Sequence, residues 1–361
     1  MIPEAELRAV LGAEAGSHSA EWLVHNPKNA VTRGVWRVTA GSASAILKVL
    51  TRAKAPASEA WLARDEPSHW NYWRREALLY QSELPSILAA LGIGSPRLLG
   101  SFERSGDEIA LWLEDVQGRR GDSWGVDDHC AAAEALGRVN AAFAKSPQLA
   151  DSPWLSRRFL RGYSDKPVQG ALLEDDAVWS HPLVAECLGD RVREAGRQLV
   201  AERDWLLDLM EALPRTLCHL DFWPMNLIRR PSGEVVALDW AFVGDGAIGE
   251  DLGNHVPDSA FDLFTPAAEL AALDQATFRA FVNGLRESGW RGEERVARLG
   301  VCASAVKYSW LLPRMLERAV AEEHASYGGS ALADPRHQYR QRGDTLCFLA
   351  GWVDEARRLA G

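Results

Sequence analysis

The chain has few cysteines, and no pattern joins them. The five cysteines are odd in number and dispersed along 361 residues, and no Cys-x-x-Cys occurs among Cys130, Cys187, Cys218, Cys302 and Cys347. This distribution is typical of reduced thiols, so it argues against a disulfide framework or a zinc site. It favours a cytoplasmic protein.

Long apolar runs and an excess of positive charge are missing as well. No stretch of about 18 apolar residues occurs, and residues 1–6 show no basic region leading into an apolar one, so we expect neither a membrane span nor a signal peptide. The formal net charge is −10. That balance disfavours nucleic acid and anionic membranes as partners, and it leaves the oligomeric state open.

The length and the pattern of the chain predict two lobes of different character. A short helix is expected at 3–12 and strands near 21–25, 35–39, 45–50, 95–102 and 108–114. One helix over 70–84, capped by Ser68 and ended by Pro85, completes this part. The expected fold class is α+β, with a small β-rich N-lobe (1–114) and a larger, mostly helical C-lobe (115–361).

In the C-lobe the apolar periodicity predicts several helices. They are expected at 129–144, 190–213, 274–288, 292–322 (bent or broken at Pro313) and 339–359. Between the second and third of these helices, strands at 227–230 and 234–238 flank the turn Pro231-Ser232-Gly233, which indicates a hairpin.

The most informative stretch lies just before that hairpin. His219-x-Asp221-x-x-x-x-Asn226, followed by Asp239 after an apolar run, has the spacing of a kinase phosphoryl-transfer centre. The hairpin returns Asp239 to the end where Asn226 lies, so an amide oxygen and a carboxylate converge. These are ligands suited to Mg²⁺. Asp221 is then placed to take a proton from an attacking hydroxyl, and His219 is expected to brace the loop.

Two charged residues upstream fit the same centre. Lys48 lies on an otherwise apolar strand face with Ile46 and Leu50 and needs an anion nearby. Glu76, beside the apolar face of the expected helix, could pair with it. Each residue also has an ordinary explanation. Lys48 could be a lysine on an edge strand, and Glu76 could be a solvated charge on the surface of a helix.

With these residues the sequence resembles the aminoglycoside phosphotransferase/choline kinase-like family, a branch of the protein-kinase-like fold. The resemblance implies that Lys48 holds the phosphates of ATP (GTP being possible), with Glu76 as its partner. It implies a hinge at Glu114–Val116 that offers backbone groups to the base.

By the same resemblance Asp221 is the catalytic base, and Asn226 and Asp239 bind Mg. Asp251 is a structural acid. One departure is the lack of a Gly-x-Gly-x-x-Gly before Lys48, because the turn 29–34 has a single glycine.

Two other functions compete with this one. A protein kinase needs an activation segment, but only eleven residues separate Asp239 from Asp251 and no Ala-Pro-Glu occurs. A catalytically silent, nucleotide-binding regulator usually loses the base or a metal ligand, and here every such residue is present. We therefore expect a small-molecule kinase.

The acceptor is expected to be a hydroxylated small molecule. Candidates are an aminoglycoside or nucleoside antibiotic, a sugar, or an amino alcohol. If the acceptor is an antibiotic, the activity confers resistance. Trp223, Asp258 and Trp310 are candidate contacts for it. Trp223 forms either a pocket wall or a core wedge, and Asp258 either faces a cationic ligand or is an ordinary surface acid.

Overall fold

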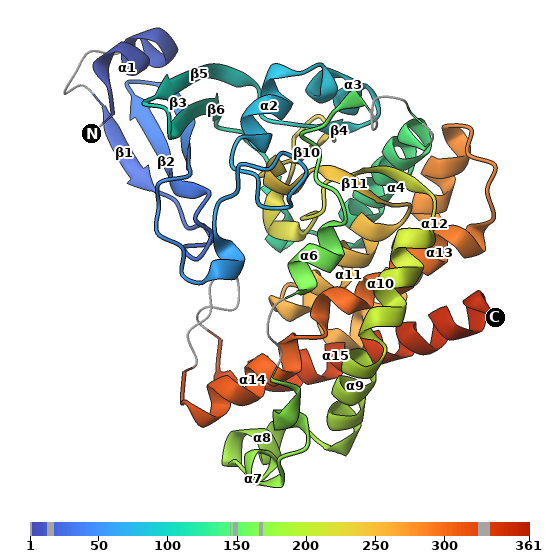
Figure 1. Ribbon diagram of the computed structural model, residues 1–361. Helices are drawn as coiled ribbons and strands as arrows, with labels where there is room; N and C mark the ends of the chain where they lie inside the picture. Colours follow the sequence, from blue (N-terminus) through green and yellow to red (C-terminus); the bar gives the residue numbers. More distant parts are fainter. Residues whose placement is uncertain (1, 13–17, 145, 147–150, 166–168, 324–332) are drawn as a thin grey trace.

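The computed structural model in Figure 1 describes residues 2–12, 18–144, 146, 151–165, 169–323 and 333–361. A five-stranded antiparallel sheet forms the N-terminal part, in the order β1-β2-β3-β6-β5. Its strands are β1 (Ser19–Trp22), β2 (Thr32–Ala40), β3 (Ala43–Thr51), β5 (Leu98–Arg104) and β6 (Glu108–Glu114). All five were expected, with shifts at their ends.

The two faces of this sheet have different neighbours. Helix α1 (Glu4–Leu11) places Leu7 against Leu47 and Val49 on one face. Because side chains alternate along a strand, Lys48 and Leu50 lie on the opposite face, and Leu50 joins the main core of the molecule. The position of Lys48 on an apolar, inward-facing strand surface is therefore as expected.

The predicted helix over 70–84 is wrong in its bounds. The structure has α2 (Arg75–Gln81) and α3 (Leu84–Ala90), with Pro85 in the first turn of α3, where proline costs no hydrogen bond. Residues 70–74 form turns instead, because Asn71 donates to the carbonyls of Trp61 and Leu62. Ser68 bonds to Glu66 and caps no helix.

A second sheet joins the two parts of the chain. Strand β4 (Ile93–Gly94) pairs in parallel with β10 (Val235–Ala237), which forms the predicted hairpin with β9 (Leu227–Arg229). Strand β7 (Arg119–Arg120) completes the order β4-β10-β9-β7. A two-stranded ladder of β8 (Arg215–Cys218) and β11 (Gly244–Ala247) lies next to the loop that carries Asp221.

The rest of the C-terminal part is helical, and its helices fill the right and lower sides of Figure 1. They are α4 (Val126–Phe143), α6 (Phe159–Ser164), α7 (Asp176–Trp179), α8 (Pro182–Cys187), α9 (Asp190–Ala201), α10 (Arg203–Ala212), α11 (Glu250–Phe261), α12 (Leu270–Glu287), α13 (Glu294–Ala303), α14 (Leu311–Val320) and α15 (Pro335–Ala360). Short 3-10 turns include η4 (Pro224–Asn226), η5 (Trp240–Phe242) and η7 (Ser304–Tyr308).

Two helix predictions in this part of the chain need correction. The expected helix 190–213 is two helices that meet at Glu202. The expected helix 292–322 breaks at residues 304–310, not at Pro313, which lies in the first turn of α14 and so removes no helical bond. Helix α11 was not predicted. Within the described ranges, no helix combines the length and the apolarity that a membrane crossing requires.

We propose that the two lobes divide at Glu114, where the last strand of the five-stranded sheet ends. The boundary is bridged twice. The chain itself crosses it at residues 114–118, and β4, which precedes it in the sequence, belongs to the sheet of the C-lobe. The face of β3 that carries Lys48 lies between the two parts.

Candidate active site

Three separate elements bring their charged side chains to one point. The Nζ of Lys48 on β3 lies 2.6 Å from Oε2 of Glu76 on α2 and 2.7 Å from Oδ1 of Asp239, at the end of the hairpin. The Lys48 and Glu76 side chains are 7% and 1% exposed, whereas that of Asp239 is 46% exposed. The structure therefore brings together three of the residues predicted from the sequence and leaves Asp239 open on one side.

Burial and the neighbouring charges shift the pKa of every member of this cluster. Burial acts to lower the pKa of Lys48, but the charges of Asp239 and Glu76 outweigh burial and raise it above its ordinary value. Burial acts to raise the pKa of Asp239, but the Lys48 charge lowers it. Burial raises the pKa of Glu76, against the charge of Lys48. Asp239 is therefore the carboxylate of the cluster that is both ionised and open to a further cation.

The hairpin explains how Asp239 reaches this position. The backbone N–H of Leu238 donates to the carbonyl of Asn226 at 2.8 Å, so the two ends of the hairpin stay together. Asp239 itself has φ = 56°, in the left-handed region. That conformation is unusual for a residue other than glycine and is typical of functional sites.

The loop that carries Asp221 is held by its backbone. Leu220 has φ = 66°, and the N–H groups of His219 and Leu220 each donate to the Asp251 carboxylate at 2.7 Å. The Nε2 of His219 donates to the carbonyl of Leu238 at 2.9 Å, and its Nδ1 accepts from the N–H of Asp221 at 3.2 Å. His219 therefore ties the loop to the hairpin, as expected.

Asp221 is partly buried, with 28% of its side chain exposed, and it lies between a hydrogen-bond donor and a cation. Its Oδ2 accepts a hydrogen bond from Nδ2 of Asn226 at 3.0 Å, while its Oδ1 lies 3.8 Å from Nζ of Lys307. Burial raises the pKa of Asp221 to about 7, against the opposing charge of Lys307. A carboxylate tuned to this range is well matched to exchange a proton with a hydroxyl near neutral pH.

The residues expected to bind metal have the right atoms free. Asn226 uses Nδ2 for two bonds to Asp221, so its amide oxygen remains as a ligand. In the part of the chain that the structure describes, no three His, Cys, Asp or Glu side chains form a metal-binding group. Mg²⁺ fits this sparse set, because it takes most of its shell from water and substrate phosphates.

In the expected hinge, the side chains of Glu114 and Val116 contact the hairpin, while the backbone groups of Val116 have no partner among the described residues. The Glu114 carboxylate makes two bonds to Arg230 of the hairpin, at 2.8 and 2.9 Å, and that ion pair lowers the pKa of Glu114. Val116 packs on Ile228 and Val236. Among the described residues, none forms a hydrogen bond with the N–H or C=O of Val116, so both remain for a ligand.

Sequence reasoning missed Lys307. Its ammonium lies near both Asp221 and Asp258, with Oδ2 of Asp258 at 3.7 Å. Asp258, on α11, has a side chain that is 17% exposed, so its description as an ordinary surface acid is wrong. A lone lysine in the apolar stretch 303–308 was the available signal, since a buried lysine needs a partner.

The aromatic candidates are less closely tied to this cluster. Trp223, two residues after Asp221, is half-buried, and its carbonyl accepts the N–H of Asn226 at 2.9 Å. Trp310, three residues after Lys307, is also half-buried. Both stay predictions as contacts of the acceptor.

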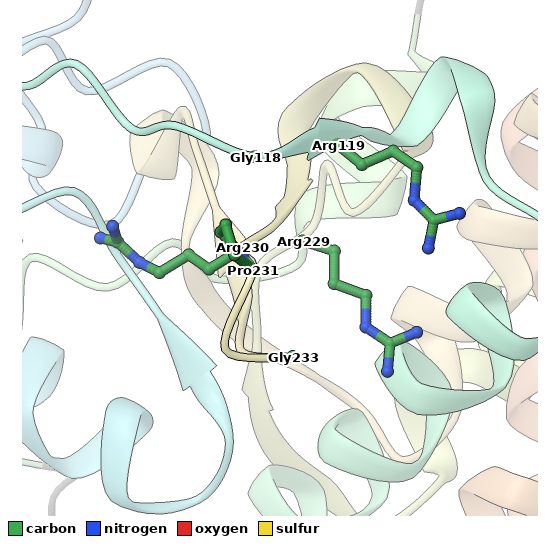
Figure 2. A pocket seen from close by; sticks show the side chains of 6 residues that line it. All are labelled: Gly118, Arg119, Arg229, Arg230, Pro231 and Gly233. Atoms are coloured by element: carbon green, nitrogen blue, oxygen red, sulfur yellow. The ribbon is translucent and has the colours of Figure 1, made fainter.

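A depression of the surface that is lined by arginines lies away from this cluster. Figure 2 shows it at the turn of the β9–β10 hairpin, where Arg119, Arg229 and Arg230 line a volume of about 470 Å³. Each arginine already has an acid, because Asp128 holds the first two and Glu114 the third. With these charges paired, the depression offers no clear binding chemistry.

The comparison with protein families identifies the chain. A model of the phosphotransferase enzyme family (APH) matches residues 29–293. The chain belongs to the phosphotransferase enzyme family. The match confirms the expected class of enzyme, a small-molecule kinase. The expected α+β fold class is confirmed by the structure itself, with a sheet-rich N-terminal part and a mostly helical remainder.

Similar solved structures are distant. The amicoumacin kinase hAmiN, solved with AMP-PNP, Ca²⁺ and Ami, has 14% identity and a TM-score of 0.48 over 90% of this chain and 88% of its own. An aminoglycoside-3′-phosphotransferase of type VIII has 20% identity and a TM-score of 0.45, and the match covers 81% of this chain and 94% of its own. APH(3″)-Id from Streptomyces rimosus, solved with ADP and streptomycin, has 16% identity and a TM-score of 0.45, and the match covers 86% of this chain and 100% of its own. No curated protein matches the chain.

Proposed function

We propose that this phosphotransferase moves the γ-phosphoryl group of Mg·ATP to a hydroxyl of a small molecule. The carrying observation is the pair of connected clusters, with Lys48 between Glu76 and Asp239 and with Asp221 bonded to Asn226. The first cluster has the charges that hold a polyphosphate, and the second has a base in reach of a nucleophile. The hairpin joins them.

Each residue has a distinct part in this proposal. Lys48 binds the α- and β-phosphates, and Glu76 fixes the direction of its ammonium. Asn226 and Asp239 hold Mg²⁺, which supplies neutralisation of the phosphate charge. Asp221 accepts the proton of the acceptor hydroxyl while the hydroxyl oxygen forms a bond to the γ-phosphorus. The bond from that phosphorus to the oxygen of the leaving ADP breaks.

The hinge supports a purine nucleotide as the donor. The N–H and C=O of Val116 form an adjacent donor and acceptor without partners among the described residues. The Watson–Crick edge of adenine, with its N1 acceptor and N6 donor, matches such a pair. Guanine presents the reverse pattern at the same edge, so we propose ATP as the donor and keep GTP as the alternative.

The acceptor is proposed to be a hydroxylated antibiotic, a sugar or an amino alcohol. It would enter beside Asp221, near Trp223, Asp258 and Trp310. The competing function is a silent, nucleotide-binding regulator. The ion pair of Lys48 and Asp239, together with the hydrogen bond between Asp221 and Asn226, supports an enzyme instead.

A coupled assay of ADP release tests the proposal. The protein is incubated with Mg·ATP and a panel of aminoglycosides, nucleosides, sugars and amino alcohols, and Asp221→Asn is measured beside it. We expect at least one acceptor to stimulate turnover. In the Asp221→Asn variant this turnover rate should fall by a factor of about 10² to 10⁴. Its affinity for Mg·ATP should stay within twofold. Nucleotide binding without turnover across the whole panel would favour the regulator.

A further inference from the structure

Lys307 differs from the other charged residues near the site, because its ammonium has open donors. It lies on η7, between α13 and α14, and its side chain is 9% exposed. The nearest carboxylate oxygens, of Asp221 and Asp258, lie 3.8 and 3.7 Å away. The ammonium of Lys48 lies 2.6 and 2.7 Å from its own carboxylates.

These distances leave the ammonium without a direct hydrogen bond. An ammonium has three donors, and direct bonds to carboxylates are about 2.7–2.9 Å long. Among the described residues, none accepts a hydrogen bond from Nζ of Lys307 within 3.5 Å. The two carboxylates hold Lys307 in place at ion-pair distance, while its hydrogens remain for a third oxygen.

The surroundings indicate the side from which that oxygen comes. Lys307 is one of the residues that line a small cavity of about 10 Å³, with Phe159 and Asn254 among its other walls. That volume holds at most one water. A phosphate-sized anion therefore reaches the ammonium from the side of Asp221, which is where the proposed acceptor hydroxyl meets the phosphoryl group.

We propose that Lys307 is a second phosphoryl-binding cation of this site. It donates to an oxygen of the phosphoryl group in transfer, on the acceptor side, while Lys48 holds the phosphates of the donor. The inference rests on the proposed function.

The choice of side chain supports this role. The chain has 40 lysines and arginines, and only six of them are lysines. Lysine is a compact charge with freely rotating donors, whereas the planar guanidinium of arginine favours a fixed, forked partner. Lys48 and Lys307 are two of those six, and both lie buried beside the carboxylates of the site.

A fluoride analogue of the phosphoryl group separates this role from a structural one. Calorimetry measures the affinity for Mg·ADP alone and then with aluminium fluoride, a planar anion that occupies the place of the phosphoryl group in transfer. The variants are Lys307→Met, which removes the charge, and Lys307→Arg, which keeps it. No acceptor needs to be known.

Arg298 offers a matched control. Arg298, on α13, is also a largely buried cation between two carboxylates, with 14% of its side chain exposed, and it bonds to Asp274 of α12 and Glu355 of α15. Arg298→Met should lower the thermal stability and leave both affinities unchanged. This variant therefore reports the effect of losing a largely buried, acid-paired cation away from the site.

In the wild type we expect aluminium fluoride to tighten Mg·ADP binding at least tenfold. Lys307→Met should keep the affinity for Mg·ADP within twofold and lose most of the tightening, and Lys307→Arg should restore part of it. Full tightening in Lys307→Met, an equal loss in Arg298→Met, or no tightening in the wild type would each overturn the inference. Failure of the wild type to bind Mg·ADP at all would instead overturn the proposed function.

Discussion

The guanidinium of Arg75 donates to the backbone carbonyl of Ala241 at 3.1 Å, which joins the helix of Glu76 to the turn that follows Asp239. Arg75 is fully buried and has no acid among its hydrogen-bond partners in the described ranges. Its other acceptors are the carbonyls of Pro67, His69, Trp70 and Trp154. Burial lowers its pKa to about 9. One side chain thus holds four segments around the Lys48 cluster.

Replacement of Arg75 by methionine should destabilise the protein strongly. The carbonyls of Trp70 and Ala241, together with the other three, would lose a charged donor and stay buried. We expect the free energy of unfolding to fall by about 3 kcal/mol or more, measured by urea denaturation. Arg75→Lys should recover a part, because an ammonium reaches fewer of the carbonyls.

Its neighbour Arg74 provides the control. Arg74 is 34% exposed and forms a surface ion pair with Glu103, so Arg74→Met should cost less than about 1 kcal/mol. Equal losses for the two variants would show that the buried carbonyl bonds of Arg75 contribute nothing beyond an ordinary surface arginine.

Removal of the Asp239 side chain should separate metal-dependent from metal-free nucleotide binding. In Asp239→Ala the site loses a proposed Mg²⁺ ligand, while Lys48 is freed from one carboxylate and keeps Glu76. We expect Mg·ATP to bind about tenfold more weakly or worse. Without Mg²⁺, calorimetry should show ATP binding unchanged or tighter. The same loss with and without the metal would remove Asp239 from the ligand set.

A buried pair of histidines should make the fold sensitive to acid. The Nδ1 of His129 lies 2.8 Å from the Nε2 of His255, and both side chains are buried. Burial lowers the pKa of His129 to about 4 and the pKa of His255 well below its ordinary value. His255 also packs on Phe222, the residue after Asp221.

The sign of the effect follows from proton uptake. An unfolded histidine takes up a proton near pH 6.5, whereas folded His129 resists until about pH 4, so lowering the pH between these values favours unfolding. His129→Gln should remove about 3 kcal/mol of this dependence. Urea denaturation of both proteins from pH 7.5 to 4.5 measures it. Parallel curves for wild type and variant would contradict the assignment.

The core of the site was predictable because its signals are local. Asn226 and Asp239 belong to one short hairpin, and the alternation of a single strand sets the direction of Lys48. Lys307 was not predictable in the same way. It meets Asp221 through a break between α13 and α14 that the helical pattern of 292–322 does not reveal.

The errors in the fold have a similar origin. The segment before Arg75 has helical apolar spacing, but tertiary bonds from Asn71 and Arg75 itself hold it in turns. Helix α11 carries His255 and Asp258 and contains Pro257. Its polar residues face inward to bind other segments, so the chain lacks the amphipathic pattern by which surface helices are recognised.

The small strand β4 limits how the two lobes can move. Ile93 and Gly94 lie before the proposed boundary at Glu114, yet they pair with Val235 and Val236 beyond it. A sliding motion of one lobe over the other would break this pairing. A rotation about the line through β4 and residues 114–118 would preserve it. Opening and closing around a nucleotide would therefore be a swing about one fixed edge, and a fragment cut at Glu114 would keep a strand whose partner is in the other fragment.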